Sequence, residues 1–205
     1  MGIVSSAKKI LIYGGVFSPP HFGHATCLES ALRLFAGDEI WLMPSADDRV
    51  DKKISVNAEQ RVEMLQLMLA EFFPQTKVPL TISPFEIEHP ELDTTYKVKQ
   101  ELERMYPNDE FYFLIGSGLW QEMKEDWQQG EEFGDSAKII IVERAEVSLP
   151  KSLPKNSCLI GEPMVKSNVS STFIRSLLAD GYSGLPYLSP AVANYIKKQQ
   201  LYTKK

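Results

Sequence analysis

Apolar and polar residues follow two patterns that alternate along the chain. Short, nearly continuous apolar runs are typical of buried strands, and segments with helical apolar periodicity separate them. The runs that predict strands are Lys9–Gly14, Glu39–Met43, Pro79–Ile82, Glu110–Gly116, Lys138–Val142 and Cys158–Ile160. Strands joined by helices predict crossover units, which build parallel sheets. We therefore predict an α/β fold: a doubly wound, Rossmann-like parallel sheet of five or six strands with flanking helices and a small C-terminal helical part.

Capping residues and apolar periodicity define the helices between these strands. One helix is predicted over Phe22–Phe35, and Asn57 with Gln60 forms a capping signature for the next. Ser189 and Pro190 fit the N-cap and first position of a terminal helix. The side chains expected to face the core are Leu28, Ala31, Leu32, Phe35, Val62, Leu65, Met68, Leu69, Phe72, Val98, Leu102, Met105, Val192, Tyr195 and Ile196.

Length and composition fit one globular unit. The 205 residues are 43% hydrophobic and 24% charged, enough to bury a core without metal or disulfide support. We predict a single domain over residues 1–205, with a leader at 1–8 and a C-terminal helical subdomain at 165–205. The start "MGIVSS" fits both a myristoylation pattern and a plain disordered leader.

Charge and cysteine usage narrow the function classes. A formal net charge of −5 provides no basic field for nucleic acid, so no nucleic-acid partner is predicted. Cys27 and Cys158 lie far apart without metal-ligand spacing, which predicts reduced thiols, no metal site and a cytoplasmic location. No apolar run approaches the roughly 20 residues of a membrane span. The sequence leaves homo-oligomerisation open.

The stretch "GGVFSPPHFGH", residues 14–24, joins the first predicted strand to the first helix. Its two leading glycines let the backbone approach a ligand, and the helix directs its free N–H groups and positive dipole end to the same place. His21 and His24 offer converging donors, and Gly23 leaves the space between them open. This arrangement predicts a bound phosphate chain. The alternatives are ordinary surface or capping histidines, and a zinc site is disfavoured because His89 is the one further histidine.

A second phosphate signature lies in "SSTFIR" near the C-terminus. Ser170, Ser171 and Thr172 place hydroxyl groups at a predicted helix start, and Arg175 follows one turn later. Such a start can hold a second phosphate group, with the guanidinium as a permanently charged donor. The alternative is a simple N-cap beside a solvated arginine.

Together these two motifs resemble signatures of the nucleotidylyltransferase superfamily, and the branch that looks most similar is the bacterial-type nicotinate-nucleotide adenylyltransferases. Four more stretches carry the resemblance, which covers about Lys9 to Tyr202: "EQRVEML", "LDTTYKVKQEL", "FYFLIGSGLW" and "LSPAVANYIKKQQLY". The resemblance implies adenylyl transfer from ATP to nicotinate mononucleotide in NAD biosynthesis. A phosphate oxygen of the mononucleotide would attack the α-phosphate directly, in line, releasing pyrophosphate, with Mg²⁺ bound to ATP.

The resemblance also implies residue roles. His21, His24 and Arg175 would be catalytic. ATP would contact Gly14, Gly15, Val16, Phe17, His21, His24, Gly116, Ser117, Ser170, Ser171, Thr172 and Arg175. The mononucleotide would contact Ser18, Lys52, Lys53, Thr95, Tyr96 and Trp127. Core packing is the alternative for Trp127, and helix capping or core packing for Thr95 and Tyr96.

Three departures from the family pattern leave the acceptor open. Ser18 and Gly118 stand where the family usually has Asp, and "DDRVDKK" replaces a Pro-Pro-His-Lys loop. The alternatives are nicotinamide mononucleotide or phosphopantetheine as acceptor, a cytidylyltransferase, or a degenerate nucleotide-binding protein without turnover.

Overall fold

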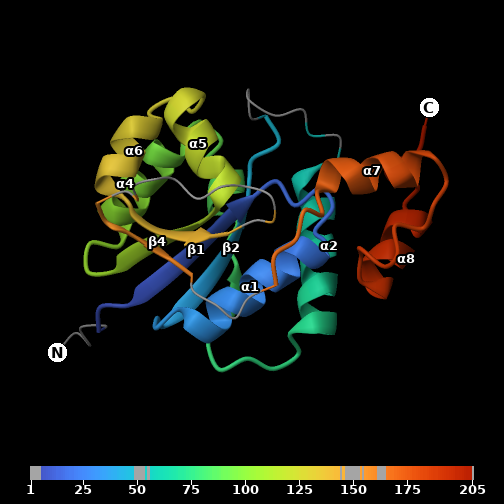
Figure 1. The fold of residues 1–205 in the computed structure, drawn as a ribbon, viewed down its shortest axis with the longest axis horizontal. Coiled ribbons are helices and arrows are strands. Elements are labelled where there is room, and N and C mark those ends of the chain that lie inside the picture. Colours follow the sequence, from blue (N-terminus) through green and yellow to red (C-terminus); the bar gives the residue numbers. More distant parts are fainter. Residues whose placement is uncertain are drawn as a thin grey trace.

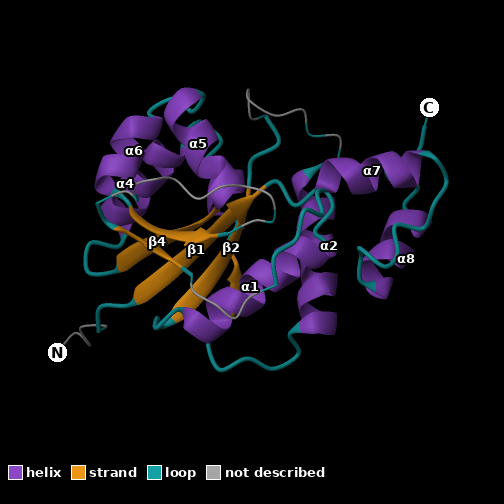
Figure 2. Cartoon of the chain, viewed as in Figure 1, coloured by secondary structure: helices purple, strands orange, loops and turns teal. Residues whose placement is uncertain are grey.

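The structure is a computed structural model that describes residues 6–48, 54, 56–143, 145, 153, 155–160 and 165–204. Within these residues, parallel strands form a single six-stranded sheet in the order β3-β2-β1-β4-β5-β6 (Figure 2). The strands are β1 (Lys9–Gly15), β2 (Glu39–Pro44), β3 (Leu80–Ile82), β4 (Glu110–Gly116), β5 (Lys138–Val142) and β6 (Ser157–Leu159). The predicted fold class is confirmed, and the strand order reverses between β1 and β4.

Helices cover both faces of this sheet. Their bounds are α1 (Phe22–Leu34), α2 (Ala58–Phe72), α3 (Phe85–Glu88), α4 (Thr95–Met105), α5 (Ser117–Glu125), α6 (Gly130–Ser136), α7 (Ser171–Ala179) and α8 (Pro190–Lys198). Figure 1 shows α4, α5 and α6 on one face, α1 and α2 on the other, and α7 with α8 beyond α2. None of the described helices is both long and apolar enough to cross a membrane.

The alternation of side chains along the strands produces two cores. On β1, Leu11 belongs to the core shared with α1, α2, α7 and α8, whereas Ile10 and Ile12 belong to the core shared with α4 and α6. Successive strand residues point to opposite faces, so a strand buried on both sides reads as a continuous apolar run. This explains why β1, β4 and β5 were recognisable from sequence.

Several predicted helix caps are present. The Asn57 side chain accepts a hydrogen bond from the backbone N–H of Gln60 at 2.9 Å. Ser189 caps α8 in the same way, with Pro190 in the first turn. These caps satisfy N–H groups that have no partner within the helix.

Two residues predicted to face the core are exposed instead. Phe72 is 37% exposed and Met105 is 43% exposed. Each is the last residue of its helix, α2 and α4 respectively, so the apolar period continues to a point where no sheet lies beneath it. The helices α3, α5 and α6 were not predicted from the sequence. Of these, α3 and α6 have only 4 and 7 residues, too few to display a clear helical period.

The packing of α4 predicts different costs for two truncations on one helix. Leu102→Ala removes a fully buried side chain and should lower the free energy of unfolding by about 2–5 kcal/mol through lost burial and a cavity. Met105→Ala at the exposed helix end should cost less than about 1 kcal/mol. Urea denaturation of both variants measures the difference, and equal losses would contradict the described packing.

Candidate functional site

An open cleft of about 380 Å³ lies at the carboxyl ends of β1, β4 and β5. This is the place where the strand order reverses, and doubly wound sheets bind ligands at such points. The predicted ATP-binding residues that line it are Gly14, Gly15, Val16, Phe17, His21, His24, Gly116, Ser170, Ser171 and Thr172. Ser117 is buried at the start of α5, directly after Gly116. The cleft therefore joins both predicted phosphate motifs.

The loop between β1 and α1 holds one wall of the cleft. Phe17 adopts a left-handed backbone conformation, with φ of 51°, and its side chain is buried. Its ring meets the rings of Tyr13 and His24 edge to face, with centroid distances of 5.5 and 5.0 Å. A non-glycine residue in this conformation is strained and is often found beside a functional site.

His21 and His24 lie together at the start of α1. Their ring centroids are 3.8 Å apart, and the backbone N–H of His21 donates to Nδ1 of His24 at 3.1 Å. Because Nδ1 of His24 accepts this bond, the neutral ring carries its proton on Nε2, which is a donor. A Cβ on Gly23 would lie 3.0 Å from Cε1 of His21, so glycine there leaves the histidine ring its place.

The start of α7 packs directly against this loop. The Ser171 hydroxyl donates to the carbonyl oxygen of Pro19 at 2.9 Å, and a Cβ on Gly23 would lie 3.2 Å from the carbonyl oxygen of Val169. Ser170 caps α7 by accepting from the backbone N–H of Phe173 at 3.2 Å. The two helix starts, far apart in the sequence, thus direct their N-termini to one cleft.

Arg175 is not among the residues that line the cleft, and its side chain contacts the loop after β1 instead. Its guanidinium donates from Nη1 to the carbonyl oxygen of Ser18 at 2.8 Å and from Nη2 to Oγ1 of Thr172 at 3.0 Å. These bonds tie α7 to the loop after β1. Direct contact between Arg175 and a phosphate stays a prediction.

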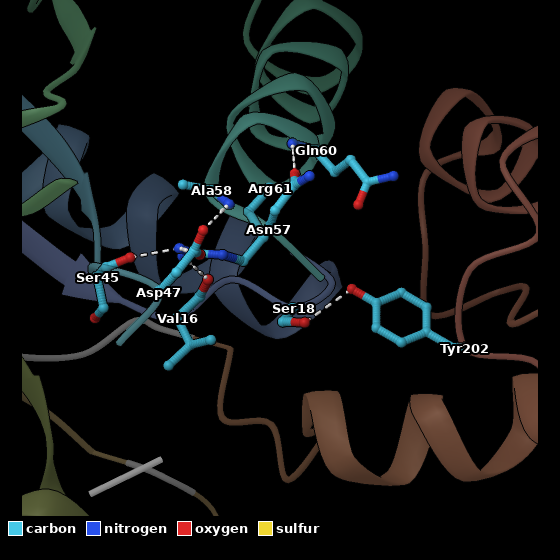
Figure 3. Close-up of polar contacts among 9 residues, drawn as sticks. All are labelled: Val16, Ser18, Ser45, Asp47, Asn57, Ala58, Gln60, Arg61 and Tyr202. Carbon is cyan, nitrogen blue, oxygen red and sulfur yellow. Dashed lines mark hydrogen bonds and ion pairs between the residues drawn. The ribbon is translucent and has the colours of Figure 1, made fainter. Parts of the chain in front are cut away.

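Arg61 is a site residue to which the sequence analysis assigned no role. Its side chain is fully buried and donates to the carbonyl oxygens of Val16 at 2.9 Å and Ser45 at 2.5 Å (Figure 3). It also pairs with Oδ1 of Asp47 at 2.8 Å, and Oδ2 of Asp47 accepts from the backbone N–H of Ala58. Arg61 therefore joins the segments that follow β1 and β2.

A sequence signal for Arg61 existed. It stands on the buried stripe of α2 with Met64, Leu65 and Met68, at helical spacing. A charged residue at a core position is rarely buried without partners, so its position on the stripe indicated a polar network.

Ser18 contacts the C-terminal segment. Its hydroxyl, buried within the loop, shares a hydrogen bond of 2.9 Å with the hydroxyl of Tyr202 (Figure 3). Burial raises the pKa of Tyr202 to about 12, so its hydroxyl is protonated at neutral pH. Tyr202 was not among the predicted site residues, and contact between Ser18 and a mononucleotide stays a prediction.

A second, small cavity of about 60 Å³ adjoins the cleft, and Gly14 and Gly15 line both. A Cβ on Gly14 would meet nothing within 4 Å, whereas a Cβ on Gly15 would lie 3.2 Å from the Phe17 ring. Leu114, Ile115 and Leu119 also line both cavities. Thr95 lines the second cavity, and Glu86 contributes a buried carboxyl group. Contact between Thr95 and a mononucleotide stays a prediction.

The remaining predicted mononucleotide residues lie apart from this lining or cannot be placed. Tyr96 and Trp127 pack against the α4–α6 core, and the Trp127 and Phe133 ring centroids are 6.3 Å apart. Lys52 and Lys53 lie outside the described residues. Thr94, and not Thr95, caps α4 by accepting from the backbone N–H of Lys97. Among the described residues, no group of three or more His, Cys, Asp or Glu side chains is arranged to hold a metal ion.

The fold and the position of the cleft are those of a nucleotide-binding α/β protein. Comparison with known proteins identifies the family. The family model described as cytidylyltransferase-like matches residues 12–177. A Bacteroides fragilis protein named probable nicotinate-nucleotide adenylyltransferase is 32% identical over 194 residues, covering 93% of this chain and 92% of the relative. A protein of the same name from Oceanobacillus iheyensis is 31% identical, covering 95% of this chain and 97% of the relative.

Solved structures agree with these sequence comparisons. The Plasmodium falciparum nicotinic acid mononucleotide adenylyltransferase complexed with NaAD superposes with a TM-score of 0.83 at 28% identity, covering 95% of this chain and 97% of that one. The same enzyme complexed with APC gives 0.80 at 26% identity, covering 95% and 97% of the two chains. The chain belongs to the cytidylyltransferase-like family and, within it, to the nicotinate-nucleotide adenylyltransferases.

Arg61 yields a stability prediction with a matched control. Arg61→Met keeps the aliphatic volume but leaves the carbonyl groups of Val16 and Ser45 without this donor, which should lower the free energy of unfolding by about 2–4 kcal/mol. Arg33→Met breaks an exposed pair with Glu29 and should cost less than about 1 kcal/mol. Urea denaturation compares the two variants, and a loss for Arg61→Met no larger than the control would show that the buried network does not stabilise the fold.

Proposed function

We propose that this chain transfers the adenylyl group of ATP to nicotinate mononucleotide, forming the dinucleotide and pyrophosphate. The observation that carries the proposal is the meeting of two helix N-termini at one cleft, in a chain that matches nicotinate-nucleotide adenylyltransferases over almost its whole length. The neighbouring solved structures, complexed with NaAD and with APC, support the same substrates. A cytoplasmic location stays a prediction.

The cleft suits a triphosphate. The backbone N–H groups at the starts of α1 and α7 and the positive ends of both helix dipoles attract phosphate oxygens. His24 adds its Nε2–H and Thr172 a hydroxyl group, and both line the cleft. Arg175 has more N–H groups than the two that bond to Ser18 and Thr172, so its guanidinium can also attract phosphate oxygens. In this proposal Mg²⁺ enters with ATP, held mainly by phosphate oxygens and water.

In this proposal the acceptor binds where the small second cavity adjoins the cleft. Gly14 and Gly15 line both cavities, so an incoming mononucleotide phosphate would pass beside backbone that carries no Cβ on its way to the α-phosphate. The attacking oxygen belongs to the substrate, so the enzyme needs no covalent nucleophile. Its contribution is alignment of the two phosphates and stabilisation of the charge that builds during transfer.

An acceptor series tests the proposed reaction. Purified protein with ATP and Mg²⁺ should release pyrophosphate and form a dinucleotide with nicotinate mononucleotide. Nicotinamide mononucleotide, phosphopantetheine and a no-acceptor reaction serve as comparisons, and the products are identified by mass spectrometry. Pyrophosphate release with phosphopantetheine alone would replace the proposed acceptor, and nucleotide binding without turnover would indicate a non-enzymatic protein.

Histidine variants test the phosphate contact. His24→Ala removes the donor at the cleft and should lower kcat by roughly 100- to 1000-fold, the effect of losing one donor to a charged transition state. His89→Ala is the matched control, because His89 pairs with Glu91 at the surface and does not line the cleft. Steady-state pyrophosphate release measures both variants. Retained activity in His24→Ala would remove His24 from the proposed mechanism.

A further inference from the structure

Segments distant in the sequence converge on residues 16–19 of the loop between β1 and α1, called here the 16–19 loop. Arg61 of α2 donates to the carbonyl oxygen of Val16, Arg175 of α7 donates to that of Ser18, and Ser171 donates to that of Pro19. The fourth bond joins the Ser18 hydroxyl to Tyr202. Of these four contacts, the Ser18–Tyr202 hydrogen bond is the one made by the segment that follows α8.

The Ser18–Tyr202 contact is sheltered from water. Ser18 is 3% exposed, and the two hydroxyl oxygens are 2.9 Å apart although 184 positions separate the residues. The Tyr202 hydroxyl also lies within the electrostatic reach of Arg175 and Arg61. If either hydroxyl were lost, the other would stay buried without a hydrogen-bond partner, and the free energy of unfolding would fall. The bond therefore holds both chain segments in place.

The backbone after α8 is shaped so that Tyr202 reaches the loop. The N–H of Leu201 donates to the carbonyl oxygen of Ile196 at 3.0 Å, which turns the chain back on the helix end. Gln200 and Tyr202 both adopt left-handed conformations, with φ of 54° and 61°. Residues other than glycine rarely adopt this conformation, so packing around Tyr202 must sustain it.

The 16–19 loop leads directly into the cleft. Val16 and Phe17 line it, and two residues after Pro19 the chain reaches His21 at the start of α1. A shift of Ser18 would therefore move the histidines and the first N–H groups of α1. Small displacements of groups that align reacting phosphates reduce rates strongly.

We propose that Tyr202 is a positioning residue of the active site, whose hydroxyl holds Ser18 so that the 16–19 loop presents His24 and the start of α1 to ATP. Tyr202 touches the loop and not the cleft lining, so it acts through Ser18. The identity of the ligand rests on the proposed function. The role of Tyr202 in shaping the cleft does not depend on which acceptor is used.

Tyr202→Phe tests this inference with a change of one oxygen atom. The ring remains to fill its place, so the fold should be kept, while the affinity for ATP with Mg²⁺ should fall by roughly three- to tenfold, the fold-change that one hydrogen bond supports. Isothermal titration measures the Kd for ATP, and kcat/KM for ATP should fall in parallel. Tyr182→Phe is the matched control, because Tyr182 is 66% exposed on the same C-terminal part.

A double-mutant cycle with Ser18→Ala separates positioning from general stability. If the two hydroxyl groups act as one unit, the double variant should bind ATP no more weakly than the weaker single variant. Additive losses would overturn the proposal, since they would mean independent roles. Unchanged ATP affinity in Tyr202→Phe with a lowered melting temperature would overturn it too, because the contact would then be structural alone.

Failure of this inference can be told from failure of the proposed function. Turnover of wild-type protein with nicotinate mononucleotide reports the function, whereas ATP binding reports the state of the cleft. If the wild-type protein binds ATP but transfers the adenylyl group to none of the acceptors, the proposed function is wrong. The double-mutant cycle of Tyr202 and Ser18 can still be measured by ATP titration in that case.

Discussion

The hydrogen bonds made to the 16–19 loop are the constraint on which the site depends. A segment that joins a buried strand to a helix would ordinarily be mobile, because it has few ladder bonds of its own. Here its carbonyl groups accept from Arg61 of α2 and from Arg175 and Ser171 of α7.

Holding the loop in this way lets backbone groups do most of the binding. The starts of α1 and α7 present N–H donors and dipole ends, and these need no side-chain reorganisation when a phosphate arrives. His24 is preorganised in the same sense, because its Nδ1 accepts from the backbone and the proton of its neutral ring is therefore on Nε2. Preorganised donors of this kind suit a reaction in which both the nucleophile and the leaving group belong to the substrates.

The position of the site follows from the sheet. Because β1 lies between β2 and β4, the crossover helices leave on opposite faces and open a crevice above the ends of β1 and β4. The cleft and the adjoining cavity meet there, at Gly14 and Gly15. A transfer between two phosphate-bearing substrates needs such a junction, since each must be held separately while their reacting groups touch.

Local patterns by themselves determined the strands, the main helices and the two helix starts that are predicted to bind phosphate. β4 and β5 were predicted to the residue, since a strand buried on both faces produces an apolar run that no exposed segment imitates. The caps at Asn57 and Ser189 were also readable, because capping depends on side chains within a few residues of the helix start. The stripe on α4 misled at Met105, where periodicity continues past the edge of the packing partner.

Only the tertiary structure decided which distant residues meet. That "GGVFSPPHFGH" and "SSTFIR" share one cleft was expected from their resemblance to a known family. The contacts that join them, Ser171 to Pro19 and Arg175 to Ser18, are set by how α7 packs against the loop after β1. No local pattern in the sequence indicated that Arg61 would contact Val16 or that Tyr202 would contact Ser18. Local sequence encodes turns, caps and apolar faces, whereas a hydrogen bond between residues 184 positions apart depends on the completed packing of everything between them.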